Sequence, residues 1–212
     1  MHYFPSQIEI WTAVHLVGFA VAFAAVSFGD FIILRGVFRK GVLHPPRLRR
    51  VGELSRCVVG GLGLMTVSGG FLAWYKFAAN ESLQKFFAKM TIVAVIVGIG
   101  IILHRHLLPS LNKCAGKPLA LVLKPKTVAI FAATGSASGI SWWSAFLLGA
   151  LPSLGRFTYV EIISVYITIS VIGTATTAIC AYLWACKAQR AMNRHRAPDI
   201  FPYSLWRSHK FP

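Results

Sequence analysis

Long apolar stretches separated by short polar segments dominate the pattern of this chain. Several of these stretches exceed the roughly 20 residues that an α-helix needs to cross the hydrocarbon core of a bilayer. None of them alternates between apolar and polar residues as the strands of a membrane barrel do, so helices are the only spanning elements to expect. The pattern therefore predicts an all-α integral membrane bundle of five transmembrane helices, at about residues 8–37, 51–77, 83–108, 127–151 and 158–187.

The segments between these helices are too short to fold as a soluble domain. Residues 1–190 are therefore expected to form a single five-helix transmembrane domain, and residues 191–212 a basic, aromatic cytoplasmic tail. Prolines mark the expected breaks, with Pro109 after the third helix and Pro152 after the fourth.

Composition and charge agree with a lipid environment and add an orientation. Hydrophobic residues make up 56% of the chain and charged residues only 13%, which is not typical of a soluble domain. The 22 Lys and Arg residues give a formal net charge of +16, but they concentrate in the segments after the first and third helices and in the tail. Because such residues are retained on the cytoplasmic side, the N-terminus is predicted outside and the C-terminus in the cytoplasm. The same residues predict contact with anionic lipid headgroups rather than with nucleic acid.

Small residues predict which helices pack closely, because they let two backbones approach in a membrane. The second helix carries Gly60, Gly61, Gly63, Ser68, Gly69 and Gly70, and the fourth carries a run of Ala, Gly and Ser over residues 132–139. We expect these two helices to pack against each other.

Four ionisable residues lie at membrane depth, where each is a candidate functional residue. His15 and Asp30 share one face of the first helix, and Lys89 and His104 have the same spacing on the third. If these faces meet, His15 lies near Lys89 at an outward level, and Asp30 near His104 at an inward one. The alternatives are an Asp30 ion pair with His104 or Arg56, a Lys89 side chain that reaches the outer surface, and a His15 imidazole hydrogen-bonded to a neighbour.

Two further features bear on function. Trp142 and Trp143 fall near the middle of the fourth helix, where we expect them either to pack against a neighbouring helix or lipid, or to form a wall against a flat cofactor or another subunit. No motif of a soluble enzyme is present, so no catalytic residue is predicted. Whether the protein is an enzyme stays open, and the sequence favours a non-enzymatic role.

Three segments resemble a superfamily of small bacterial membrane proteins. They are HLVGFAVAFAAVSFGDFIILR (residues 15–35), LSRCVVGGLGLMTVSGGFL (54–72) and FFAKMTIVAVIVGIGIILHRHLLP (86–109). They are similar to the first three spans of the copper-resistance D proteins and the membrane-bound protoporphyrinogen oxidases. The resemblance covers the first half of the chain and implies a location in the bacterial inner membrane.

The resemblance also implies a site for a b-type haem. His15 and Lys89 correspond to the His and Lys that the oxidase branch places near haem, so His15, Lys89 and His104 become candidate cofactor-binding residues, and His15 the candidate metal ligand. His15 and His104 lie roughly 20 Å apart along the membrane normal, too far to ligate one iron together. The alternative function is a non-catalytic accessory subunit of a larger respiratory or photosynthetic membrane complex, which contacts partner helices, lipid or pigment.

Overall fold

The computed structural model describes residues 5–40, 45–79, 83–113, 116 and 123–196. Within these residues the chain forms helices and no strand, which confirms the all-α prediction. The elements are α1 (Pro5–Lys40), α2 (Pro45–Ala78), α3 (Gln84–Ile102), the π-helix η1 (Leu103–Leu107), α4 (Leu108–Lys113), α6 (Pro125–Ala150), the 3₁₀-helix η2 (Pro152–Arg156) and α7 (Tyr159–Arg196).

Four helical segments in the described part of the chain are long and apolar enough to cross a membrane. They are Gln7–Ile33, Pro45–Ala78, Gln84–Lys113 and Tyr159–Ala191. The protein is therefore a multi-pass membrane protein. Helix α6 has the length of a span but is not among these four, and Thr, Gly and Ser residues occupy its middle.

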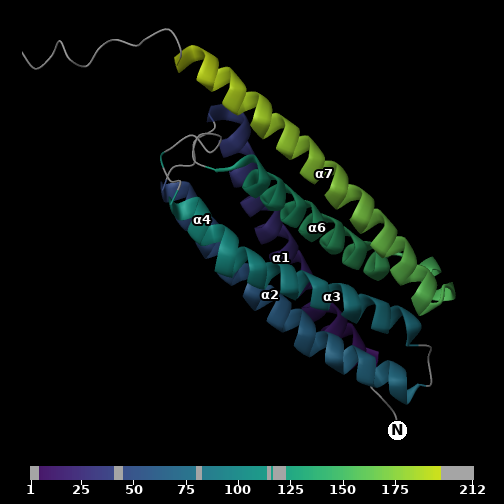
Figure 1. The fold of residues 1–212 in the computed structure, drawn as a ribbon. Coiled ribbons are helices and arrows are strands. Elements are labelled where there is room, and N and C mark those ends of the chain that lie inside the picture. The colour runs from purple at the N-terminus through teal and green to yellow at the C-terminus, as the bar shows by residue number, and fades with distance from the viewer. Residues whose placement is uncertain (1–4, 41–44, 80–82, 114–115, 117–122, 197–212) are drawn as a thin grey trace, which may run out of the picture.

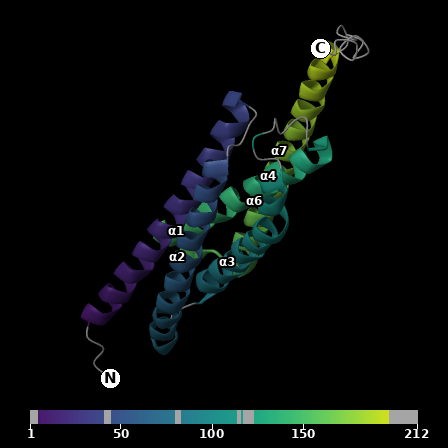
Figure 2. The ribbon, with the colours of Figure 1, turned by 90° about the vertical axis from the view of Figure 1, so that its left-hand side faces the viewer.

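The helices run roughly side by side in an elongated bundle (Figure 1). Helix α1 packs along α2, α6 packs along α7, and α3 packs against α6. Figure 2 shows α1 and α2 as a pair that diverges from α6 and α7 toward the end where α7 finishes. The prediction that the second and fourth helices pack tightly together is wrong, because α2 packs mainly against α1 and α6 packs mainly against α7.

Gly18 and Gly61 show how closely α1 and α2 approach. A Cβ added at Gly61 would lie 2.6 Å from the Gly18 carbonyl oxygen and 2.8 Å from Ala22 Cβ. A Cβ added at Gly18 would lie 3.0 Å from the Gly61 carbonyl oxygen. Only glycine fits at this crossing, where the two backbones touch.

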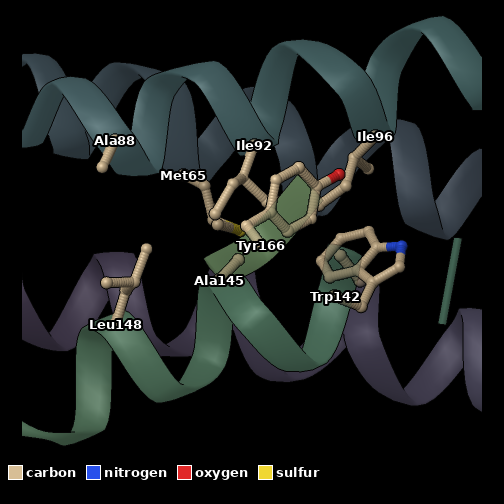
Figure 3. Packing of buried hydrophobic residues seen from close by; sticks show 9 residues of the cluster. Met65, Ala88, Ile92, Ile96, Trp142, Ala145, Leu148 and Tyr166 are labelled. Carbon is tan, nitrogen blue, oxygen red and sulfur yellow. The ribbon is translucent and has the colours of Figure 1, made fainter. Parts of the chain in front are cut away.

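The core of the bundle lies where α3, α6 and α7 meet, with Ala22 and Met65 from α1 and α2 beside it (Figure 3). Trp142 is 1% exposed and Ile92 is fully buried there. The Ser141 hydroxyl donates to the Ala137 carbonyl at 2.7 Å and lies 2.8 Å from the Tyr166 hydroxyl. The buried hydroxyl of Ser141 is therefore satisfied within the protein, as a polar group at membrane depth must be.

The prediction that the third helix ends before Pro109 is wrong. The helix continues through η1 into α4, and Pro109 is the second residue of α4. A proline removes one backbone donor and clashes with the carbonyl four residues earlier, here that of Arg105. The wider π-helical turn over Leu103–Leu107 accommodates both effects, so the helix continues beyond the proline.

The last helix also extends further than expected. Helix α7 continues through Arg196, so the first residues of the predicted tail are helical. The aromatic part of that tail, residues 197–212, lies outside the described residues.

Candidate functional site

The outward-level pair is the clearest polar contact between helices that are distant in sequence. His15 projects from α1 and Lys89 from α3, and Lys89 Nζ lies 3.1 Å from His15 Nε2. This confirms that the two side chains are neighbours. Lys89 therefore points into the bundle rather than to the outer surface.

Helix α2 fixes the other side of the imidazole. His15 Nδ1 lies 3.1 Å from the Met65 carbonyl oxygen and 3.1 Å from Ser68 Oγ. The carbonyl can only accept, and the Ser68 hydroxyl already donates to the Leu64 carbonyl at 2.6 Å. The proton therefore resides on Nδ1, and the lone pair of Nε2 faces the Lys89 nitrogen.

Close packing with α2 reinforces this orientation. A Cβ added at Gly69 would lie 3.3 Å from His15 Cε1, so the ring rests against a glycine backbone. Ser68 is fully buried. The imidazole is thus held by α2 on one side and by Lys89 on the other, which confirms the interpretation of a hydrogen-bonded histidine.

Lys89 also lies beside the last turn of α6. A Cβ added at Gly149 would lie 3.6 Å from Lys89 Nζ. One turn away on α3, Lys85 Nζ donates to the Leu151 carbonyl at 2.8 Å. The C-terminal end of a helix carries partial negative charge, so both ammonium groups lie where α6 attracts them.

Five aromatic rings join α1 to α6 near this pair. Phe19 lies 5.9 Å from Trp142 and 5.8 Å from Phe146 between ring centroids, and Phe23 lies 5.2 Å from Trp143. Trp142 is buried, which confirms the packing interpretation for that residue, whereas Trp143 is 55% exposed. The aromatic cluster, defined as Phe19, Phe23, Trp142, Trp143 and Phe146, begins one helical turn inward of His15.

At the inward level, the expected contact between Asp30 and His104 is wrong. His104 lies on η1, and its Nδ1 is 3.3 Å from Ser55 Oγ of α2. The only ion pair between side chains that the structure describes joins Arg49 to Glu53, so Asp30 pairs with neither His104 nor Arg56. The register of α3 brings His104 beside α2 instead of α1.

Sequence reasoning missed the part of the site that α2 supplies. Ser68 and the Met65 carbonyl hold His15, whereas the sequence presents Ser68 only as one of the small packing residues of the second helix. Nothing in the sequence singles out Gly149 as a neighbour of Lys89. A serine such as Ser68 can be predicted to bind a histidine at membrane depth only when it is known which helix packs beside that histidine.

The positions of His15 and Lys89 are compatible with one way of holding a haem and incompatible with another. Metal–nitrogen bonds of about 2 Å place two ligands on opposite faces of one iron roughly 4 Å apart, so His15 and Lys89, at 3.1 Å, are too close for that pairing. The chemistry of the two residues fits a different arrangement, in which the His15 imidazole would ligate the iron and the Lys89 ammonium group would pair with an acidic substituent of the haem. No group of three or more His, Cys, Asp or Glu side chains in the described part of the chain is arranged to hold a metal ion.

Comparison with known proteins finds no match to a protein family, to a curated protein or to a solved structure.

Proposed function

We propose that the chain crosses the membrane five times, with α6 as the fourth crossing. Helix α6 has 26 residues, which at 1.5 Å per residue extends roughly 39 Å. It lies along α7, and α1 begins at the end of the bundle opposite to the one where α7 finishes (Figure 1). An odd number of crossings is needed to separate the two ends in this way.

The orientation follows from the basic residues. They gather where α1 ends and α2 begins, where α4 ends and α6 begins, and at the end of α7. These segments belong in the cytoplasm, with the N-terminus outside, and they attract anionic headgroups of the inner leaflet. Together with the resemblance of the first three helices, these basic segments support a location in a bacterial inner membrane.

At the outward level we infer a site for a flat, acid-bearing cofactor, with b-type haem as the first candidate. The observation that carries this inference is the contact between His15 and Lys89. Lys89 is a cation without a carboxylate partner among the described side chains, and an acidic substituent would supply one. Pairing of Lys89 with that substituent would release Nε2 of His15, the nitrogen whose lone pair can ligate iron.

The surroundings of the pair suit such a group. Phe19 and Phe146 lie within a turn of His15 and Gly149, and the exposed ring of Trp143 extends the aromatic cluster toward the lipid. Aromatic faces stack favourably on flat conjugated rings. Haem would supply one-electron chemistry, and His15, Lys89 and the cluster would set its position and electrostatics.

The test is a dithionite-reduced minus oxidised optical spectrum of the protein purified in mild detergent. We expect a b-type signal in the unaltered protein and its loss in His15→Ala. His106→Ala is the matched control, because His106 lies exposed on η1 far from the pair, and its signal should be unchanged. A featureless spectrum of the unaltered protein, or a full signal in His15→Ala, would rule out this site.

A second function, that of a non-catalytic accessory subunit, is favoured by the exposed side of α7. Large apolar residues cover it along its length, including Val160, Val171, Ile172 and Leu183. Lipid covers such a surface in an isolated protein, and a partner helix would cover it in a complex. Purification from native membranes in mild detergent tests this, since co-migration of a stoichiometric partner is expected only of a subunit.

A further inference from the structure

A groove separate from the His15–Lys89 pair opens between α3, α6, η2 and α7. Its volume is about 440 Å³, within the range of small-ligand sites. Its floor is the core itself, formed by Ile92, Leu148 and Tyr166. The groove therefore reaches from the surface of the bundle to its centre.

The walls of the groove face the hydrocarbon of the membrane. Leu147, Val165 and Ile169 line it and are 43%, 59% and 52% exposed. Most lining side chains are apolar, and those from α6 and α7 lie along two helices that we propose to cross the bilayer. A hydrocarbon chain can enter sideways from the lipid without desolvating a polar group.

One end of the groove is polar and lies where α6 and α7 are joined, at the membrane interface. Glu161, in the first turn of α7, lines this end together with Phe157. The Glu161 carboxylate accepts the backbone N–H of Thr158 at 2.8 Å and its hydroxyl at 2.9 Å, which leaves lone pairs free for another donor.

A positively charged residue adjoins the lining residue Phe157 in the sequence. Arg156 directly precedes Phe157 and is exposed; its Nε donates to the Ser153 carbonyl at 3.1 Å. A guanidinium group has five N–H donors, so four are left for an anion. The segment that joins α6 to α7 therefore carries an anion that lines the groove, Glu161, and an exposed cation next to the lining residue Phe157.

This combination matches a zwitterionic lipid. The phosphate of an amine-bearing phospholipid complements Arg156, and its ammonium group complements Glu161, while one acyl chain extends along the apolar walls. An acidic lipid would satisfy Arg156 but meet repulsion from Glu161. We propose that the groove is a binding site for one phosphatidylethanolamine-type phospholipid.

The experiment is native mass spectrometry of the protein released from bilayers that contain equal amounts of phosphatidylethanolamine and phosphatidylglycerol. We expect one retained lipid for each chain, predominantly phosphatidylethanolamine. Ile169→Trp fills the groove and should reduce retention several-fold. Ile172→Trp, on the same helix, does not line the groove and should retain lipid as the unaltered protein does.

Glu161→Gln tests the headgroup separately. Glutamine keeps the hydrogen bonds that cap α7 but removes the charge, so the helix start is preserved. The preference for phosphatidylethanolamine over phosphatidylglycerol should then fall toward an equal ratio. Absence of retained lipid, equal retention of both lipids by the unaltered protein, or equal retention by Ile169→Trp and Ile172→Trp would each overturn the proposal.

Discussion

Replacement of Gly61 by alanine adds a single methyl group at the tightest point of the bundle. That Cβ would lie 2.6 Å from the Gly18 carbonyl oxygen, 2.8 Å from Ala22 Cβ and 2.9 Å from Ala22 N. None of these atoms is the end of a flexible side chain that could rotate away. Helices α1 and α2 must therefore move apart by roughly 1 Å to reach ordinary van der Waals separation.

The cost of this movement has two sources. A shift of this size forfeits about a quarter to a half of the dispersion attraction between the facing atoms. It also stretches the hydrogen bonds from His15 to the Met65 carbonyl and Ser68 Oγ, since both acceptors lie on α2 within two turns of Gly61. Overpacking of this kind costs about 1–3 kcal/mol.

Gly60→Ala is the matched control. Nothing lies within 4 Å of a Cβ added at Gly60, which is adjacent in the same helix. The two substitutions change helix propensity equally, so the difference between them isolates the steric effect. Thermal unfolding in mild detergent, followed by circular dichroism, should show Gly61→Ala melting clearly below Gly60→Ala. Equal melting temperatures would refute the close crossing of α1 and α2.

Further predictions concern the core, the buried hydrogen bond and the topology. Trp142→Ala removes a ring that is 1% exposed and should cost about 3–5 kcal/mol in thermal unfolding, whereas Trp143→Ala, which removes a 55% exposed ring, should cost far less. Tyr166→Phe removes the hydroxyl that lies 2.8 Å from Ser141 Oγ and should destabilise the protein by about 1 kcal/mol in the same assay. In a variant without native cysteines, an impermeant thiol reagent added to intact cells should label Ser153→Cys but not Lys113→Cys; the reverse pattern would contradict the proposed orientation.

The apolar pattern predicted where the helices lie, and its errors have local causes. The start of α2 at Pro45 and the passage of the third helix through Pro109 depend on turn geometry. A proline is readily accepted in the first turn of a helix, and a π-helical turn accommodates one further along, so neither residue ends a helix here.

Helix partners were harder to predict than helices. Gly61 was recognised as a packing residue, but its partner is Gly18 of the preceding helix, and a single sequence does not show which surfaces meet. For the same reason, one of the two expected contacts between polar residues is present and the other is not. His15 and Lys89 were matched correctly by depth, whereas His104 meets Ser55 because α3 turns that face toward α2.

The most direct test of the account is a double-mutant cycle on His15 and Lys89. His15→Phe and Lys89→Met roughly preserve side-chain volume, and the coupling free energy is obtained from unfolding of both single variants and the double variant in detergent. We predict a coupling of roughly 1 kcal/mol, typical of a hydrogen bond between membrane helices. The control cycle pairs His15→Phe with Lys85→Met, whose lysine donates to the Leu151 carbonyl instead, and should be additive. A coupling for His15 and Lys89 no larger than that of the control would contradict the contact on which the proposed cofactor site rests.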